Sequence, residues 1–422
     1  MTARRAATDA VRRAPADGLA LVHTPWASER VTNVIQIPAM KRIARDVCLA
    51  FCLAAPLPAV AAPRCPAPAR PTLTAVPGDP FSALPTSDGC WLFVSLSGRH
   101  DHGSVAVLRD ERGSFDLSRT VALSAAALGE ALSPDGRLLA VTTLAGVDLL
   151  DVARLERPGG DPLVARLRDG SPQPVYAAIS RDNRLLFVSD ETSHRISVFN
   201  LVLADSRRHR AAALVGHIPT AFAPVGLAVS PDGKWLYATS EVAPRVSGFP
   251  DRCSPPFDAY GRHQPVGVLL KIDIAKAAID PRHSVVAGVP AGCQPVRVAV
   301  SPSGETLWVT ARGDNALLRI PAADLNSGAG HLDTDSFPIG TDPVGLAVRP
   351  DDRQVWVADS ARFVSGRSGR LAGLTGIHGK GKVELMSAAA KGSPQELSFL
   401  PDGRTLVVTL FSARAVEFMP TP

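Results

Sequence analysis

The chain has 422 residues, of which 45% are hydrophobic and 20% are charged, and its formal net charge is +5. Length alone suggests two or three domains. Basic and aromatic residues do not interleave in a patch, which excludes the usual nucleic-acid-binding surfaces, so we expect no nucleic-acid partner. Residues 1–62 contain eight basic and four acidic residues; removing them from totals of 45 and 40 leaves 37 and 36, a nearly neutral remainder.

Residues 40–62 have the organisation of a secretory signal peptide. Met40, Lys41 and Arg42 form a positive start, Val47–Val60 is apolar, and small residues at 59–61 form a cleavage pattern. The apolar stretch is too short for a helix that spans a membrane. We therefore expect a periplasmic or secreted protein with no membrane span after cleavage.

Residues 1–39 lie upstream of this signal and are rich in Arg and Ala. We interpret them as a mis-called or disordered extension, with Met40 as the true start. The alternative is an uncleaved cytosolic tail.

Seven copies of one sequence block follow. Each contains the pattern apolar–apolar–x–Ser–Pro–Asp–Gly and then an apolar run ending in Thr, as in Ala228–Thr239, although four copies are degraded. Pro presets one turn position, Asp bonds its own backbone and Gly allows positive φ, so the block predicts a tight turn between strands. The anchor residues recur roughly every 50 positions, which is typical of a radial or stacked repeat. They are Asp88, Asp135, Asp182, Asp232, Ser303, Asp351 and Asp402.

The strands beside each turn are apolar throughout, which indicates burial on both faces. A third strand and a short outer strand, as at Ser284–Val289 and Ser336–Ile339, complete each copy. Four antiparallel strands repeated seven times predict an all-β fold, a seven-bladed β-propeller over residues 66–422. The expected third strands are Ser104–Leu108, Val147–Asp151, Ile196–Asn200, Gly267–Asp273, Leu317–Ile320, Lys382–Met386 and Ala415–Met419. Thr72–Val76 is expected to supply the outer strand of the last copy and close the ring.

Four cysteines remain after the predicted cleavage, and an even number in an exported chain suggests disulfides. Three pairings of Cys65, Cys90, Cys253 and Cys293 are possible. We favour Cys65–Cys90 with Cys253–Cys293, because the topology puts the latter two on one face in adjacent blades. The cysteines lack the spacing of a zinc site, and we expect neither a metal nor another cofactor.

The loops opposite the turns vary in length, whereas the turns are uniform, so we expect function on the loop face. Two insertions lengthen this face, Glu241–Val266 in the fourth copy and Asp359–Lys380 in the sixth. The fifth copy stands between them and places Arg297 at the channel rim, with Arg312 and Asn315 in its loop.

Positions equivalent to Arg297 are mostly small, which predicts an open channel mouth; Tyr176 and Glu396 are exceptions, and Glu130 lies one position out of register. An arginine in such a mouth is a candidate for binding an anion or carboxylate. The alternative is an Arg297–Glu396 pair or solvated side chains at the rim. The candidate ligand-binding residues are Arg297, Arg312, Asn315, Glu396, Tyr176, Glu130, Asp359 and Arg362.

The blocks SPDGKWLYATS and PVRVAVSPSGETLWVTARGDNALL resemble the YVTN-type β-propeller repeat. Val298–Ser301 and Leu307–Thr310 match its two inner strands, and Leu270–Asp273 matches its third. Lactonase-like seven-bladed propellers share this repeat, and similar propellers occur in bacterial periplasmic and surface proteins and in the large subunit of amine dehydrogenases. The resemblance implies the fold, but the matching positions are turn or core positions and carry over no catalytic residue.

Two functions fit these observations. A scaffold that binds a small molecule or a protein at the channel mouth is favoured, because the chain has no Gly-x-Ser-x-Gly elbow and no evident catalytic triad. The alternative is a lactonase-like hydrolase acting on a sugar or acyl lactone, in which Arg297, Arg312 or Glu396 polarises the ester and activates water. A redox-partner subunit ranks last, since no haem or quinone signature is present.

Overall fold

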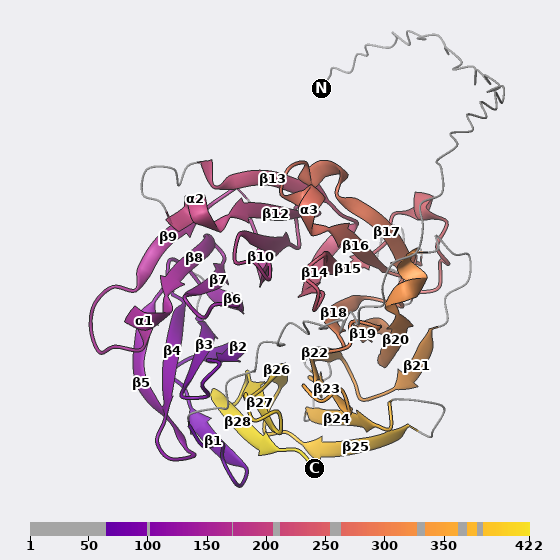
Figure 1. Cartoon of the computed structure of the whole chain (residues 1–422). Helices are drawn as coiled ribbons and strands as arrows, with labels where there is room; N and C mark the ends of the chain where they lie inside the picture. Colours follow the sequence, from indigo (N-terminus) through magenta and orange to yellow (C-terminus); the bar gives the residue numbers. More distant parts are fainter. Residues whose placement is uncertain are drawn as a thin grey trace, which may run out of the picture. The chain divides into compact units, whose positions relative to one another are not determined.

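The chain forms a seven-bladed β-propeller in the computed structural model (Figure 1). The structure describes residues 65–98, 102–170, 172–205, 212–253, 263–326, 334–361, 369–377 and 383–422, all within one compact unit, Ala59–Pro422. Within these ranges, 28 strands form seven antiparallel sheets of four strands each. The fold predicted from the repeats is therefore confirmed.

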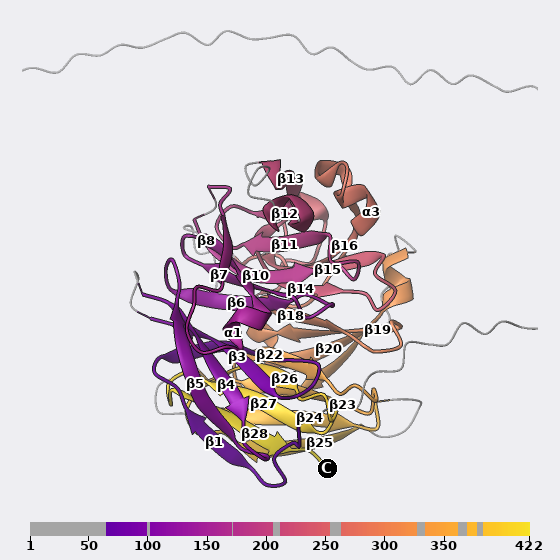
Figure 2. The same cartoon turned by 60° about the vertical axis from the view of Figure 1, so that its left-hand side comes forward.

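Each blade contributes an inner strand next to the channel and a second strand beside it (Figure 1). Figure 2 shows the same blades turned by 60°. Blades 1–7 are numbered here by the chain order of their inner strands. The inner strands are β2 (Asp79–Pro85), β6 (Ala127–Leu132), β10 (Pro174–Ile179), β14 (Phe222–Val229), β18 (Pro295–Val300), β22 (Pro343–Val348) and β26 (Pro394–Phe399). The second strands are β3 (Trp91–Ser97), β7 (Leu138–Thr143), β11 (Leu185–Asp190), β15 (Trp235–Val242), β19 (Thr306–Ala311), β23 (Gln354–Asp359) and β27 (Thr405–Leu410).

Third and outer strands complete the blades. The third strands are β4 (Ser104–Asp110), β8 (Gly146–Asp151), β12 (Arg195–Asn200), β16 (Val268–Asp273), β20 (Ala316–Pro321), β24 (Arg370–Thr375) and β28 (Ala415–Pro420). The outer strands are β5 (Phe115–Ala122), β9 (Leu163–Leu167), β13 (Leu214–Pro219), β17 (Val285–Pro290), β21 (Asp335–Pro338), β25 (Glu384–Ala389) and, for blade 7, β1 (Thr72–Ala75).

Short helical turns occur in several connections. They are α1 (Val152–Leu155), α2 (Leu201–Asp205), α3 (Ile274–Ala277), η2 (Arg245–Ser247), η3 (Pro281–His283), η4 (Arg312–Asp314) and η5 (Ala322–Asn326). The carboxylates of Asp151 and Asp273 cap α1 and α3 by accepting backbone N–H bonds, as N-cap residues do. In the described part of the chain, no helix is long and apolar enough to cross a membrane.

The third strand of blade 6 differs from the prediction. Lys382–Met386 was expected there, but β24 pairs with β23, and the outer strand β25 covers most of the expected segment. The true third strand lies inside the stretch interpreted as an insertion. Gly373 interrupts the apolar pattern of this strand. The position requires glycine, because a Cβ there would lie 2.9 Å from the Trp356 ring.

The N-terminal strand closes the ring as predicted. Strand β1 pairs with β28 from Thr72↔Phe418 to Ala75↔Ala415, so the last blade has its fourth strand. The rings of Phe115 and Phe418 stack with centroids 4.6 Å apart and pack blade 1 against blade 7. Closure covers the apolar faces of blades 1 and 7, which an open stack would expose, while each sheet keeps only short edges.

Both faces of each blade are buried between neighbouring blades. Leu92 and Val94 of β3 pack in the cluster shared with blade 7, whereas Phe93 between them packs in the cluster shared with blade 2. All three side chains are fully buried. This two-sided burial explains why the strands read as continuous apolar runs.

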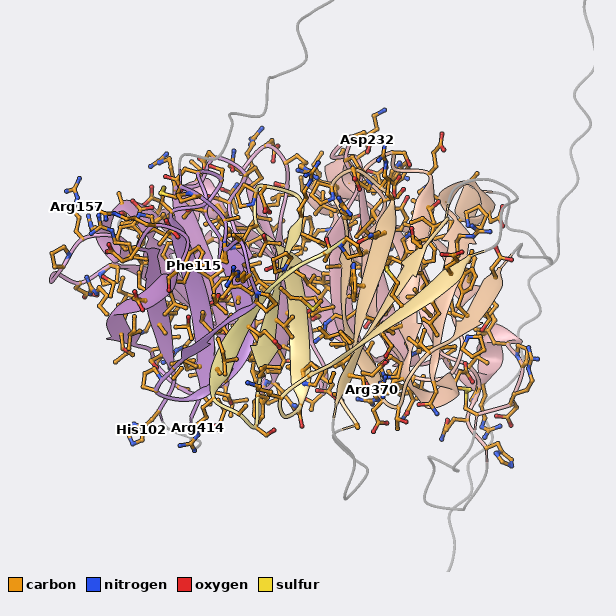
Figure 3. The ribbon with its side chains drawn as sticks, turned by 90° about the horizontal axis from the view of Figure 1, so that it is seen from below. His102, Phe115, Arg157, Asp232, Arg370 and Arg414 are labelled. Atoms are coloured by element: carbon orange, nitrogen blue, oxygen red, sulfur yellow. A yellow bond between two sulfur atoms is a disulfide. The ribbon has the colours of Figure 1, made fainter. Side chains whose placement is uncertain are left out.

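The Ser-Pro-Asp-Gly blocks form the turns between inner and second strands. In blade 4, Ser230 Oγ donates to Asp232 Oδ1 at 2.5 Å and accepts from the Trp235 N–H at 2.9 Å. Gly233 has a φ of 72°, which a residue with a side chain rarely adopts. Figure 3 shows the two faces of the ring, with Asp232 on the turn face and His102, Arg370 and Arg414 on the opposite, loop face.

A hydroxyl in the second strand links six blades to the next inner strand. These hydroxyls donate to a backbone carbonyl across the blade junction at 2.5 to 3.2 Å. The pairs are Ser95–Leu128, Thr142–Val175, Ser189–Val225, Thr239–Val296, Thr310–Val344 and Thr409–Phe81. Blade 6 has Ala358 at this position, so no such hydroxyl reaches blade 7.

Candidate functional site

A cavity of about 280 Å³ lies at the mouth of the central channel. The positions equivalent to Arg297 in the seven blades are called the Arg297 column. Each inner strand lines the cavity with the residue one position before this column: Phe81, Leu128, Val175, Val225, Val296, Val344 and Gln395. A second layer comes from the ends of second strands: Ser97, Glu191, Glu241, Arg312 and Phe411. Both positions lie at the loop-facing ends of their strands, so the cavity belongs to the loop face.

Three side chains of the Arg297 column meet across the channel. Glu396 Oε2 accepts hydrogen bonds from Arg297 Nε and from the Tyr176 hydroxyl, each at 2.8 Å. The Arg297 guanidinium lies 3.6 Å from the Tyr176 ring centroid, a cation–π contact. Of the two roles compatible with the sequence, anion binding by Arg297 or a pair with Glu396, the structure contains the pair.

Glycines in alternate blades make this convergence possible. Blades 2, 4 and 6 have glycine in the Arg297 column, whereas blades 3, 5 and 7 have Tyr176, Arg297 and Glu396. A Cβ on Gly226 would lie 2.6 Å from the Val296 carbonyl oxygen and 2.9 Å from the Cα of Arg297. Glycine in one inner strand therefore allows the next inner strand, which carries the large side chain, to approach closely.

Arg297 is buried, with 6% of its surface exposed. Burial lowers the pKa of its guanidinium from the ordinary value, and the adjacent Glu396 carboxylate acts in the opposite direction. Arginine still remains protonated at neutral pH. A buried ion pair of this kind costs desolvation, and removing one partner leaves the other charge uncompensated.

A second charged group lies at the rim of the cavity. Arg312 Nη2 donates to both Glu241 oxygens, at 2.9 and 3.1 Å. Burial raises the pKa of Glu241; Arg312 opposes this shift and Glu191 adds to it. Burial likewise raises the pKa of Glu191, again opposed by Arg312. Two carboxylates thus share the field of one arginine.

Gln395 is the polar member of the apolar ring. Its side chain is buried, with 5% of the residue exposed, and its Oε1 has no hydrogen-bond partner. The Gln395 carbonyl is also the one that faces Ala358 rather than a hydroxyl. The junction between blades 6 and 7 therefore departs from the repeat in two ways.

The other candidate residues do not line this cavity. Asn315 ends η4 in a left-handed conformation, and its Oδ1 accepts the Asp342 N–H at 3.0 Å, which ties two loops together. Asp359 lies against Gly340 and Arg370 in a separate hollow. Arg362 lies outside the described residues. Of the predicted set, Tyr176, Arg297 and Arg312 line the cavity, and Glu396 bonds two of them.

Glu130 points into the interface between blades rather than into the channel. It pairs in register with Val141, which packs in the cluster between blades 1 and 2. The residue is 6% exposed and neither carboxylate oxygen has a partner. Burial holds the pKa of Glu130 well above its usual value. A one-residue offset moves a strand side chain to the other face, which explains why it misses the mouth.

Asp359 is a second carboxyl with a strongly altered pKa. Its Oδ2 accepts the Gly340 N–H at 3.1 Å, and its Oδ1 has no partner. Burial raises the pKa of Asp359 to about 7, although the Gly340 bond and Arg370 oppose this shift. The contrasting Asp190 of blade 3 accepts bonds from Gln173, Thr192 and Ser193, which lower its pKa.

The structure contains the favoured disulfides, Cys65–Cys90 and Cys253–Cys293. The second joins the insertion between β15 and β16 to the loop that precedes β18. Next to it, Asp314 accepts the Cys293 N–H at 2.7 Å. These contacts hold the described part of the insertion around Cys253 against blade 5.

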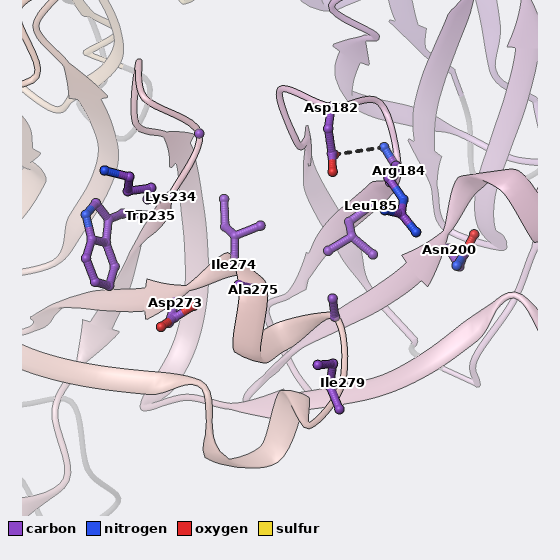
Figure 4. A pocket seen from close by; sticks show the side chains of 12 residues that line it. Asp182, Arg184, Leu185, Asn200, Lys234, Trp235, Asp273, Ile274, Ala275 and Ile279 are labelled. Carbon is purple, nitrogen blue, oxygen red and sulfur yellow. Dashed lines mark hydrogen bonds between the residues drawn. The ribbon is translucent and has the colours of Figure 1, made fainter.

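Larger hollows occur on the turn face. One of about 690 Å³ lies between blades 3 and 4, where Trp235, Ile274 and Leu185 flank charged side chains such as Arg184 (Figure 4). Similar hollows lie between blades 1 and 2 and between blades 4 and 5. Their recurrence between successive turns follows from the repeat geometry, whereas the channel mouth is a single, non-repeating arrangement. Among the described residues, no group of three or more His, Cys, Asp or Glu is placed to hold a metal ion.

No protein-family model matches the chain, and the search of curated proteins found no match. Several solved structures share the fold. Hydrazine synthase from Kuenenia stuttgartiensis is 18% identical, with a TM-score of 0.61 over 82% of this chain and 96% of that chain. The beta-propeller domain of Cps50 (Swd1) from Myceliophteria thermophila is 14% identical, with a TM-score of 0.58 over 82% and 97%. A chain of the mitotic checkpoint complex is 16% identical, with a TM-score of 0.60 over 89% and 99%. At such identities the similarity shows the fold alone.

The cavity residues Glu191, Glu241 and Gln395 were not among the sequence predictions. Glu191 and Glu241 share one column with the predicted Arg312, nine positions after the turn anchor, and Gln395 occupies the column before Arg297. Aligning these two columns across the seven copies would have revealed both layers. In the column before Arg297, six residues are apolar and form the ring, and Gln395 is the polar exception.

Proposed function

We propose that this chain is an exported YVTN-type β-propeller that binds a small ligand in the cavity at its channel mouth. The observation that carries the proposal is the concentration of non-repeating polar residues in this cavity. Tyr176, Arg297 and Arg312 contribute to it, together with two glutamates, above a ring that is apolar in six blades of seven. Apolar walls with few polar groups are typical of small-molecule sites.

The size of the cavity favours a small ligand over a protein segment. Its volume of about 280 Å³ is near the lower end of the range of roughly 300–1,000 Å³ for ligand pockets. Export is supported by the leader pattern at residues 40–62 and by two disulfides, which persist in oxidising compartments. The proposed mature chain begins near residue 62, after the signal peptide, and contains the propeller from about residue 66.

Lactone hydrolysis has weaker support as an alternative function. Both arginines required to polarise an ester are engaged by carboxylates, Arg297 by Glu396 and Arg312 by Glu241. Assays of the purified exported protein with sugar and acyl lactones test this alternative directly. Turnover above the buffer rate that is lost in Arg297→Met would favour the hydrolase.

The binding proposal is tested by filling the cavity. Ser97→Trp places a large side chain in the cavity wall, and Ser87→Trp makes the same change at an exposed position on the turn face. A panel of amines, carboxylic acids, sugars and lactones is first screened for compounds that raise the melting temperature of wild type. We expect these compounds to raise the melting temperature of Ser87→Trp equally, but not that of Ser97→Trp. Equal shifts in both variants would place binding elsewhere. Mass spectrometry of the exported protein gives its N-terminus, which we expect near residue 62.

A further inference from the structure

The charged residues of the mouth do not balance. Around the cavity, Arg297 is paired with Glu396, and Arg312 is paired with Glu241. Glu191 is the fifth charged residue of this group and adds a negative charge. Among the described residues of the mouth, two arginines face three glutamates, an excess of one negative charge when all five groups are ionised.

Glu191 forms no ion pair within the described residues, although Arg312 is close enough to oppose the rise of its pKa. Gln173 Nε2 donates to its Oε2 at 3.0 Å, and its backbone N–H bonds to the Gln173 carbonyl at 3.2 Å. No arginine, lysine or histidine of the described residues lies within ion-pair distance, 4.0 Å, of its carboxylate. Both Glu191 and Gln173 line the cavity. The carboxylate is therefore preorganised and accessible to a ligand.

Gln395 supplies an independent indication on the far side of the channel. It belongs to blade 7 and Glu191 to blade 3, so the two face the cavity from non-adjacent blades. The buried Oε1 of Gln395 is a hydrogen-bond acceptor without a donor. Buried acceptors are almost always satisfied in folded proteins. This oxygen has an exposed area below 1 Å², so the Gln395 side chain, which lines the cavity, must rotate toward it before a ligand donor can satisfy the oxygen.

The wall between these two groups is apolar. Phe81, Val175, Val225 and Val296 form a buried cluster around the axis, with Leu128 and Phe411 packed against it. A hydrated inorganic cation would gain nothing from such a wall, whereas a hydrocarbon body would be buried by it.

We propose that the cavity binds a small organic ammonium compound, with its cationic group at Glu191, its apolar body against the ring, and a hydrogen-bond donor directed to Gln395. This inference rests on the proposed function and specifies its ligand class. Charge-assisted hydrogen bonds are stronger than neutral ones, so Glu191 is expected to dominate affinity.

Four matched probes separate the contributions: trans-4-aminocyclohexanol, cyclohexylamine, cyclohexanol and cyclohexanecarboxylate. We expect calorimetric titration of the full exported protein to show cyclohexylamine binding about tenfold more tightly than cyclohexanol, with the carboxylate weakest. Glu191→Gln should abolish this preference. Gln395→Leu should retain it but lose the additional affinity given by the hydroxyl of aminocyclohexanol. Glu305→Gln, an exposed change on the turn face, is the control and should behave as wild type.

Three results overturn the inference. Cyclohexanol or the carboxylate binding wild type as tightly as the amine would exclude cation recognition, while binding that is lost in Ser97→Trp would still support the proposed function. An amine preference unchanged in Glu191→Gln would remove that residue's role. No binding of any probe by wild type at millimolar concentration would exclude the ligand class, and the broader panel would then decide the proposed function separately. If Glu191→Gln does not melt as wild type does, the wild-type comparison alone decides.

Discussion

The junction between blades 6 and 7 lacks the hydroxyl that links every other pair of neighbouring blades. Ala358 is fully buried at the position where Ser189 of blade 3 accepts the Tyr176 N–H at 3.3 Å and donates to the Val225 carbonyl at 2.7 Å. Ala358→Ser adds one oxygen at the equivalent point. The new hydroxyl should accept from the Gly345 N–H and donate to the Gln395 carbonyl.

The expected gain follows from the value of one additional buried hydrogen bond. A typical intramolecular bond contributes about 1 kcal/mol net, and a buried group without a partner costs about 1–3 kcal/mol. We therefore expect Ala358→Ser to raise the free energy of unfolding by about 1 kcal/mol. Because the unfolding entropy scales with chain length, this corresponds to roughly 1–2 °C in melting temperature for a unit of this size.

The reverse change provides the matched control. Ser189→Ala removes the hydroxyl from blade 3 and should lower stability by about 1–3 kcal/mol, because it leaves the Val225 carbonyl and the Tyr176 N–H without that partner. Differential scanning calorimetry measures both variants, and hydrogen exchange of the peptide containing Gly345 should slow in Ala358→Ser alone. A serine variant that melts at or below wild type, beside a clearly destabilised Ser189→Ala, would refute the reasoning.

Three other predictions concern buried carboxyls and a disulfide. Glu130→Leu replaces an unpartnered carboxyl by leucine, the residue that blades 6 and 7 have at the equivalent position. The change should raise the free energy of unfolding by about 1–3 kcal/mol at pH 7, measured by urea unfolding. A loss of stability would contradict the absence of a partner for this carboxyl. Burial raises the pKa of Asp359 to about 7, above the value near 3.9 of an unfolded aspartate, so the folded state keeps a proton that the unfolded state has lost. Stability should therefore fall by up to about 1.4 kcal/mol per unit as pH rises from about 4 to about 7, and Asp359→Asn should flatten this decline; an unchanged pH profile would exclude it. The double change Cys253→Ala and Cys293→Ala removes a disulfide that closes a loop of sequence separation 40. It should lower the free energy of unfolding by up to about 4 kcal/mol, and the first sign should be faster proteolysis between β15 and β16. Resistance to proteolysis equal to that of wild type would show that other contacts hold the insertion.

The propeller could be predicted from sequence because each signal occurs seven times. The turn at Asp232 is well formed, whereas Ser303 replaces the aspartate of another turn, but their common spacing identifies both. The third strand of blade 6 was missed because Gly373 breaks its apolar run and a nearby insertion hides the spacing. A local error of this kind does not alter a fold supported by six other copies.

The site was less predictable, because position in a repeat does not determine which side chains interact. Tyr176, Arg297 and Glu396 were predicted to share a column, but only the geometry shows that Glu396 accepts bonds from both others. Glu130 was placed beside them, yet its one-residue offset turns it into a blade interface. Glu191 stands out only against the other members of its column in the seven copies.

Two departures from the repeat fall at one junction and lower stability there. Ala358 omits a hydroxyl link, and Gln395 introduces an unsatisfied buried acceptor, both at one junction. Each departure costs free energy that the other blades do not lose, since they have a hydroxyl and an apolar residue at these positions. Proteins tolerate such local costs mainly where function requires them. If the cost at Gln395 is offset by a ligand, Gln395→Leu should stabilise the free protein while weakening the complex, and a variant that is neutral in both states would break that connection.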